Sequence, residues 1–514
     1  MKSSTGNQKP KQNWGDKFLN VVEKTGNKLP HPVTLFFIFA ATVLVLSFVL
    51  SAFDVSAQHP DPDIEEPIKV INLLSREGIR DILTGAVGNF TGFAPLGVVL
   101  VAMLGVGVAE RSGLIAAMLK KIVMGAPDKL VTAVVVFAGV MSSMASDAGY
   151  VVLVPLGAVI FLAKGRHPIA GLAAAFAGVS GGFSSNLIIT MIDPLLGGFT
   201  QEAARMFDAT YSVTPAANLY FMMASTVLIT CIGVLITEKV VEPRLGTYTG
   251  SYKQDLEPIT PREIKSLKIA LLALIGFIAV VALMTIPETG ILRTDEGALL
   301  DDPASPFIGA MIPLISASFF IPGLAYGISA GTIRKDKDVA KFMEETMSTM
   351  GGYIVLAFAA AQFVAYFEWS NIGLILAISG AEFLQAINLT GIPLILAFIF
   401  VSGIINLFVG SASAKWAIMA PVFVPMLMTM GYSPEVAQLA YRIGDSTTNI
   451  ISPLMPYFAI IVAFAQKYDK KLGIGTLIST MVPYSIAFMI AWMIMLTIWM
   501  LIGLPIGPET PVIY

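Results

Sequence analysis

The chain has 514 residues, of which 55% are hydrophobic and 13% are charged, and its mean hydropathy is +0.77. This composition leaves too little polar surface for a soluble globular protein and predicts a polytopic membrane protein. The formal net charge of -3 says little about partners, because the positions of Lys and Arg matter more than their sum. Cys231 is the single cysteine, which excludes an internal disulfide, and the three histidines lack the carboxylate spacing of a zinc hydrolase.

The first half of the chain alternates apolar segments with basic and acidic connectors. About 20 apolar residues cross a membrane and Lys and Arg collect on the cytoplasmic side, so the Lys-rich N-terminus is expected to be cytoplasmic and uncleaved. Spans are expected at 33–53, 93–110 and 216–237. Between them, 130–163 has short apolar arms, basic residues at both ends and a polar tip, which favours a re-entrant hairpin, although two short spans also fit. Residues 168–196 then cross outward as a helix broken at 181–186.

The second half repeats this order from the opposite side. Spans are expected at 266–286, 307–330, 347–370 and 474–503, with a short interfacial helix around 371–389. A second hairpin at 391–430 is entered from outside, and 437–465 cross inward with a break from Gly444 to Asn449. The predicted fold is an all-α polytopic membrane protein with nine transmembrane helices, two re-entrant hairpins and two broken helices, arranged as an inverted repeat. Its expected parts are a cytoplasmic segment 1–32, a first half 33–237, a cytoplasmic connector 238–265, a second half 266–503 and a periplasmic C-terminus 504–514.

The repeat is most evident in two polar tripeptides. Ser184-Ser185-Asn186 recurs as Thr447-Thr448-Asn449, each in a long apolar stretch and each downstream of a hairpin. A backbone group left unpaired in hydrocarbon costs several kcal/mol, so two equivalent interruptions indicate a transporter binding site at a repeat interface. For one copy alone, the same residues could simply bond back to their own helix or join neighbouring spans.

Broken helices offer free N–H groups to a substrate carboxylate, and free carbonyls with hydroxyl and amide oxygens to a cation. A sodium ion could therefore bind at Asn186 and at Asn449. Protons are the other candidate coupling ion, carried by intramembrane carboxylates. No other cofactor is expected. The candidate ion-coupling residues are Asp147, Ser184, Ser185, Asn186, Asp193, Thr447, Thr448 and Asn449.

Charged residues inside predicted spans give the candidate substrate site. Asp193 has no basic residue within two turns and is the expected coupling carboxylate, because burial without a basic partner raises a carboxylate pKa. Arg442 and Asp445 lie three apart on one helical face and are expected to pair, either to orient substrate or simply to neutralise each other. Lys415 lies at the second hairpin tip. Trp416 follows it, away from any interfacial belt, and is expected to stack on an aromatic solute.

Five segments resemble the AbgT family of p-aminobenzoyl-glutamate transporters and antimetabolite exporters. They are 29–36, 89–97, GRHPIAGLAAAFAGVSGG at 165–182, GSASAKWAIMAPVFVPML at 410–427 and AYRIGDSTTNIISPLMPYF at 440–458. The resemblance implies a bowl-shaped homodimer with nine spans and two hairpins in each protomer, and substrates such as p-aminobenzoyl-glutamate or exported sulfonamides. It places the family's functional positions at Asp193, Ser413, Trp416, Pro434, Arg442, Asp445 and Pro453.

The sequence as a whole predicts a secondary active transporter of the bacterial inner membrane, with no enzymatic activity and no nucleic-acid partner. Its site should accept the benzoyl ring at Trp416 and the glutamyl carboxylates at Arg442, Lys415 and the helix N-termini. No nucleotide-binding motif is present, which argues against ATP drive. A sodium-coupled dicarboxylate carrier, a channel and an intramembrane enzyme are the alternatives. The sequence fixes neither the direction of transport nor the coupling ion.

Overall fold

The computed structural model describes residues 30–58, 66–145, 149–250, 259–297, 299, 305–453, 455 and 457–514. The described chain is almost entirely helical, with one two-stranded antiparallel pair, β1 (Ser56–Ala57) and β2 (Ile68–Lys69). Eight described helices are long and apolar enough to span a membrane, or up to ten if each of two bent helix pairs is counted as one span. This confirms the all-α polytopic fold.

The first half begins with a helix that is capped at its start. The His31 imidazole accepts a hydrogen bond from the Val33 N–H (3.3 Å), and Pro32 occupies the first turn, where its missing N–H is harmless. The helices of this half are α2 (Pro32–Ala52), α3 (Arg76–Thr91), α4 (Ala94–Arg111), α5 (Leu114–Met124), α6 (Val131–Met141), α7 (Val154–Ala163), α8 (Pro168–Phe176), α9 (Ile192–Arg205), α10 (Leu219–Ile236) and α11 (Glu242–Leu245).

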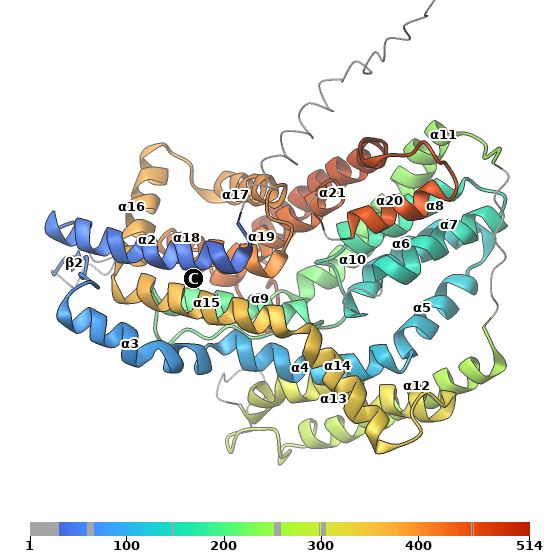
Figure 1. Cartoon of the computed structure of the whole chain (residues 1–514), viewed down its shortest axis with the longest axis horizontal. Helices are drawn as coiled ribbons and strands as arrows, with labels where there is room; N and C mark the ends of the chain where they lie inside the picture. Colours follow the sequence, from blue (N-terminus) through green and yellow to red (C-terminus); the bar gives the residue numbers. More distant parts are fainter. Residues whose placement is uncertain are drawn as a thin grey trace, which may run out of the picture.

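The second half starts with a capping box, in which Thr260 and Glu263 satisfy each other's backbone N–H groups. Its helices are α12 (Pro261–Thr285), α13 (Pro306–Ala330), α14 (Asp336–Thr349), α15 (Gly351–Trp369), α16 (Ile372–Ala386), α17 (Gly391–Asn406), α18 (Ala412–Thr429), α19 (Pro434–Asn449), α20 (Phe458–Gln466) and α21 (Ile474–Ile502). Figure 1 shows α12 and α13 together at the lower edge, on the opposite side of the molecule from α8 and α20.

Several helices, among them α3, α5 and α14, were not expected from the sequence. Helix α3 leads into α4 with a short interruption at Gly92 and Phe93, and α14 precedes α15. Both α3 and α14 carry charged residues in their first turns, such as Arg76, Glu77 and Asp336, so neither forms the continuous apolar run that marks a span. Sharp bends of 114° and 120° also separate α5 from α6 and α16 from α17, which sets the entry direction of each predicted hairpin.

The first predicted hairpin and broken helix appear as short helices joined by irregular backbone. Helices α6 and α7 are separated by a 3₁₀ turn (Ser142–Ala145), three residues outside the described part, and a π-helical turn (Gly149–Leu153). Asp147 therefore lies outside the described residues. Helix α8 continues into a second π-helical turn (Ala177–Gly181) and ends before 182–191, which contain Ser184, Ser185 and Asn186. The first break is confirmed.

The second break begins later than expected. Helix α19 is continuous through Gly444 and ends at Asn449, and the described residues from 450 to 457 form turns before α20 starts at Phe458. The prediction of a break from Gly444 was wrong, because this glycine permits close helix packing instead. A Cβ at Gly444 would lie 2.4 Å from the Ile399 carbonyl oxygen, so α17 rests directly against the backbone of α19.

Glycine permits the same kind of contact in the first half. A Cβ at Gly178 would lie 2.4 Å from the Val136 carbonyl oxygen of α6. In both halves the first arm of the hairpin therefore packs closely on the broken helix.

Outside the predicted spans, His167 is the N-cap of α8, and its Nδ1 accepts from the Ile169 N–H at 3.2 Å. Burial lowers the pKa of His167, which favours the neutral ring that this cap requires.

Candidate functional site

The two breaks meet in the interior of the protein. The Ser184 N–H donates to the Ser446 hydroxyl of α19 at 3.2 Å, and the Ser180 hydroxyl lies 3.7 Å from the Met455 sulfur. Ser184, Ser185, Asn186, Thr447, Thr448 and Asn449 are all buried. Segments about 260 positions apart thus form one polar centre inside an apolar protein, the arrangement expected of a site at a repeat interface.

Asp193 and Arg442 form an ion pair in this centre. Arg442 Nη1 lies 2.7 Å from Asp193 Oδ1, and the two side chains are only 1% and 4% exposed. The other carboxylate oxygen, Oδ2, accepts from the Thr190 N–H at 2.6 Å and from the Thr190 hydroxyl at 2.9 Å, which ties Asp193 to the segment just before α9. The prediction that Asp193 lacks a basic partner was wrong, because its partner comes from the other half of the chain.

Asp445 is also paired differently from the prediction. Its Oδ1 accepts a hydrogen bond from the Lys415 ammonium of α18, and its Oδ2 accepts from the Asn449 amide at 3.1 Å. The expected pair between Arg442 and Asp445 does not form. Although Arg442 and Asp445 share a helical face, each forms its ion pair with a residue of another helix.

Arg442 keeps unused hydrogen-bonding capacity. Its Nε and Nη2 atoms are buried and have no hydrogen-bond partner in the described part of the chain, and the close contact with Asp193 Oδ1 lacks the alignment of a hydrogen bond. A buried donor without a partner costs about 1–3 kcal/mol. These two donors are therefore suited to an acidic ligand, which a guanidinium can bind through two parallel hydrogen bonds.

Trp416 is fully buried and stacks on Tyr441, with ring centroids 4.5 Å apart and planes inclined by 25°. Its indole N–H donates to the Thr200 hydroxyl at 2.9 Å. At least one face of the expected solute-stacking ring is thus covered by the protein. The equivalent residue of the first half, Tyr150, stacks on Tyr457 at 4.6 Å in the same manner.

The remaining predicted residues lie around this centre. Ser413 is partly exposed, with its hydroxyl 3.4 Å from that of Ser411, the N-cap of α18. Pro434 opens α19, and Pro453 lies in the turn region after it. Asn406 of α17 was not predicted, yet its amide contacts three oxygens at the end of α19. The sequence signal that could have identified Asn406 is an asparagine within the apolar first arm of the second hairpin.

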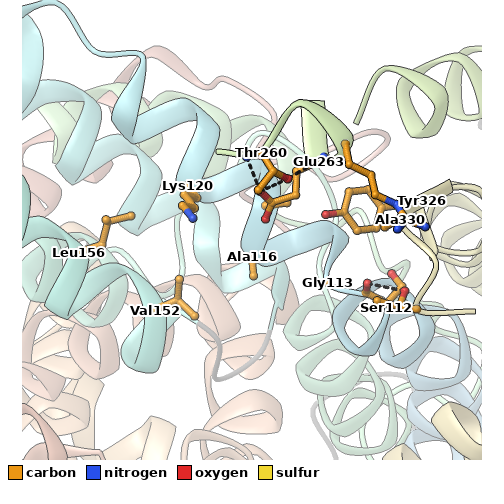
Figure 2. A pocket seen from close by; sticks show the side chains of 13 residues that line it. Ser112, Gly113, Ala116, Lys120, Val152, Leu156, Thr260, Glu263, Tyr326 and Ala330 are labelled. Carbon is orange, nitrogen blue, oxygen red and sulfur yellow. Dashed lines mark hydrogen bonds between the residues drawn. The ribbon is translucent and has the colours of Figure 1, made fainter. Parts of the chain in front are cut away.

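A large cavity lies apart from the buried ion pairs. It has a volume of about 590 Å³, and none of the predicted site residues lines it. Figure 2 shows Val152 and Leu156 of the first hairpin region, Lys120 of α5, and Glu263 and Tyr326 of α12 and α13 around it. The cavity therefore separates the hairpin region from the helices α12 and α13.

Comparison with known proteins places the chain in a family. The AbgT putative transporter family matches residues 17–514. The chain belongs to the AbgT family. It is 42% identical over 499 residues to the p-aminobenzoyl-glutamate transport protein of Escherichia coli strain K12, covering 97% of each protein. Members of this family are transporters, and the chain is accordingly a multi-pass membrane transporter rather than an enzyme.

Two solved AbgT structures resemble the whole fold. The YdaH transporter of Alcanivorax borkumensis, described as having an unusual topology, is 46% identical with a TM-score of 0.88, over 93% of this chain and 100% of that one. MtrF of Neisseria gonorrhoeae, described as illuminating a class of antimetabolite efflux pumps, is 50% identical with a TM-score of 0.90, over 96% and 100%. The arrangement of hairpins and broken helices is thus an AbgT arrangement.

Proposed function

We propose that this chain is a secondary active transporter that moves p-aminobenzoyl-glutamate, or exports sulfonamide-type antimetabolites, and is driven by an ion gradient, with protons favoured. The observation that carries the proposal is the Arg442 guanidinium, which is buried beside both breaks. Its Nε and Nη2 donors have no hydrogen-bond partner among the described residues. The names of the similar proteins support the substrate class, because one transports p-aminobenzoyl-glutamate and another belongs to the antimetabolite efflux pumps.

The chemistry of the proposed substrates suits this site. p-Aminobenzoyl-glutamate joins an aminophenyl ring to a dicarboxylate, and sulfonamides share the ring beside an acidic group. The acidic end would bind Arg442, and the ring would lie against the aromatic pair of Trp416 and Tyr441 once the hairpin moves. Asp193 is then a positioning residue for Arg442 rather than a free proton carrier.

A sodium-coupled dicarboxylate-type carrier is the second candidate, favoured by the neutral oxygens of the first break. The Asn186 Oδ1 and Ser143 hydroxyl lie 2.6 Å apart, and the buried Ser185 hydroxyl has no hydrogen-bond partner among described residues. Hard cations prefer such oxygens. A channel is less favoured, because it would need a continuous polar path rather than a closed centre.

Counterflow in proteoliposomes tests the proposal. Vesicles loaded with unlabelled p-aminobenzoyl-glutamate should accumulate the labelled compound transiently, and a sulfonamide should compete. Imposing a pH gradient and a sodium gradient separately then identifies the coupling ion. Absence of counterflow with either class of solute contradicts the proposed substrates, while equal downhill flux without counterflow indicates a channel.

The proposed setting is the bacterial inner membrane, with the N-terminus cytoplasmic, the C-terminus periplasmic and two copies forming a homodimer. The distribution of Lys and Arg among the loops supports this orientation. Labelling of single cysteines placed at the exposed positions Glu509 and Lys470, in a variant without Cys231, should reach the first from the periplasm and the second only from the cytoplasm. Cross-linking in membranes tests the dimer.

A further inference from the structure

A cluster of oxygens at the C-terminal end of α19 is held together by two nitrogens from the second hairpin. The Asn406 amide nitrogen lies 2.8 Å from the Asp445 carbonyl, the Thr448 hydroxyl and the Asn449 side-chain oxygen. The Lys415 ammonium donates hydrogen bonds to the Asp445 carboxylate and to the Asn406 side-chain oxygen. The two hairpin arms, α17 and α18, are thereby joined to the broken helix.

These oxygens are the kind that bind a small hard cation. The cluster lies at the partially negative end of a helix. It contains a carboxylate, a backbone carbonyl, a hydroxyl and two amide oxygens, each in contact with the side chain of Asn406 or Lys415 or belonging to Asn406 itself. The Lys415 side chain, 1% exposed, delivers its positive charge into this group. The Tyr441 ring, whose centroid is 5.5 Å from Lys415 Nζ, adds a further favourable contact for a cation.

We propose that the Lys415 ammonium is a tethered cation that occupies, in the second half, the position a free sodium ion would otherwise take. The second break then needs no free sodium to close its hairpin. This inference goes beyond the transport proposal, because it assigns a cation position whatever solute the protein moves.

The first half lacks such a tethered charge. No Lys or Arg occurs between 131 and 163, where the first hairpin lies. The corresponding contact joins neutral groups, since the Ser143 hydroxyl donates to Asn186 Oδ1 at 2.6 Å. The Asn186 amide nitrogen and the Ser185 hydroxyl are buried without hydrogen-bond partners in the described part of the chain. Of the two hairpins, only the second carries a Lys or Arg.

Removal of the ammonium should create a sodium site. In Lys415→Ala the Asp445 carboxylate stays buried without its charged partner, and sodium can enter the space left by the side chain. A ligand that binds only the folded state raises the melting temperature in a saturable manner. At saturating sodium we expect a shift of roughly 5 °C beyond that of the wild type, measured against choline chloride at equal ionic strength.

Thermal unfolding of the purified full-length protein in detergent is the measurement. Lys415→Ala and Lys415→Gln, which keeps most of the side-chain volume, should both gain the sodium-specific shift. Lys415→Ala combined with Asp445→Asn should not gain it, because the carboxylate is gone. Lys470→Ala, in the loop after α20, should respond to sodium as the wild type does.

Two results would overturn the proposal. The first is a sodium response of Lys415→Ala and Lys415→Gln equal to that of the wild type. The second is failure of both variants to fold when extracted in sodium as well as in choline, since sodium should replace the missing ammonium. Because the readout is unfolding and not transport, either result leaves the transport proposal to be judged by counterflow.

Discussion

The two breaks share a backbone plan but differ in charge. In the first, Asn186 is bonded to a neutral hydroxyl of the hairpin, Ser143. In the second, Asn449 and Asp445 meet an amide and an ammonium of the hairpin, from Asn406 and Lys415. Both halves therefore have a contact between hairpin and broken helix, but the contact includes charged groups only in the second half.

This difference in charge indicates how the two halves of an inverted repeat can have different functions. Arg442 on α19 contacts Asp193 on α9, so this ion pair between the broken helices takes its cation from the second half and its anion from the first. A ligand acid that competes for Arg442 would weaken this contact between the halves. Substrate binding and movement of one half against the other can thus be linked through one guanidinium.

The largest expected effect comes from breaking that contact. Arg442→Met should abolish substrate binding and lower the free energy of unfolding by about 3–5 kcal/mol, because it leaves the Asp193 carboxylate buried without its charge partner. Arg442→Met with Asp193→Leu should recover much of the stability but none of the binding. Substrate affinity by fluorescence and unfolding in mixed micelles measure the two quantities. Normal binding by Arg442→Met would remove Arg442 from the substrate site.

Asp193→Asn sharpens the same comparison. The amide can retain the contacts with Thr190, just before α9, but loses the charge opposite Arg442. We expect weaker transport with a measurable change in substrate affinity, which a free proton carrier would not show. Affinity and pH-driven uptake, measured on the same preparation, distinguish these roles. Unchanged affinity together with loss of pH-driven accumulation would restore Asp193 as the coupling group.

Substitution of Trp416 distinguishes two roles of the pair formed with Tyr441, which are packing within the protein and contact with the substrate ring. Trp416→Ala should cost about 3–5 kcal/mol of stability, because it opens a cavity beside Tyr441 in a fully buried site. Trp416→Phe keeps the stack and loses only the hydrogen bond to Thr200, about 0.5–1.5 kcal/mol. Substrate affinity of the Phe variant should stay near that of the wild type. A large loss of affinity in this variant would show that the indole N–H matters to binding.

The two asparagines give a smaller effect that compares the halves directly. Asn449→Ala removes the donor to the buried Asp445 Oδ2 and one of the three acceptors around the Asn406 amide, whereas after Asn186→Ala the Ser143 hydroxyl can still donate to the Val140 carbonyl. We expect both variants to lose transport, and Asn449→Ala to be less stable by about 1–3 kcal/mol. Expression, unfolding and uptake are the measurements. Normal uptake by either variant would contradict the functional equivalence of the breaks.

The sequence predicted the architecture better than the pairing of charges. The repeated tripeptides and hairpin tips were recognisable because polar residues rarely interrupt apolar spans. The partners of Asp193 and Asp445 were not recognisable from the sequence. Spacing along one helix suggests that Arg442 pairs with Asp445, but in the structure Arg442 pairs with Asp193 and Lys415 pairs with Asp445, each from a different helix. Helix packing fixes those contacts, and a single sequence carries no direct signal of it. Helices α3 and α14 were missed because their charged first turns conceal the helical pattern.

The smallest effect lies within one tripeptide and separates its two threonines. The Thr447 hydroxyl bonds back to its own helix, 2.8 Å from the Ile443 carbonyl, and its contact with another helix is to the Met489 sulfur of α21, a weak acceptor, at 3.5 Å. The Thr448 hydroxyl also donates to its own helix, at Gly444, but it accepts a hydrogen bond from Asn406 of the hairpin as well. Valine has nearly the same shape as threonine without the hydroxyl, so it removes these contacts with little change in packing.

We expect Thr447→Val to transport normally and to change stability by less than about 1 kcal/mol, because the lost bond is local and its carbonyl partner remains in the helix. Thr448→Val should lose about 0.5–1.5 kcal/mol and slow transport, since the Asn406 amide loses one of its three acceptors and its contact with the hydroxyl of α19. Uptake and unfolding of the two variants, measured side by side, provide the test. Equal behaviour would mean that the contact between hairpin and helix at Thr448 has no part in transport, and the hairpin's attachment would then rest on Asp445 and Asn449.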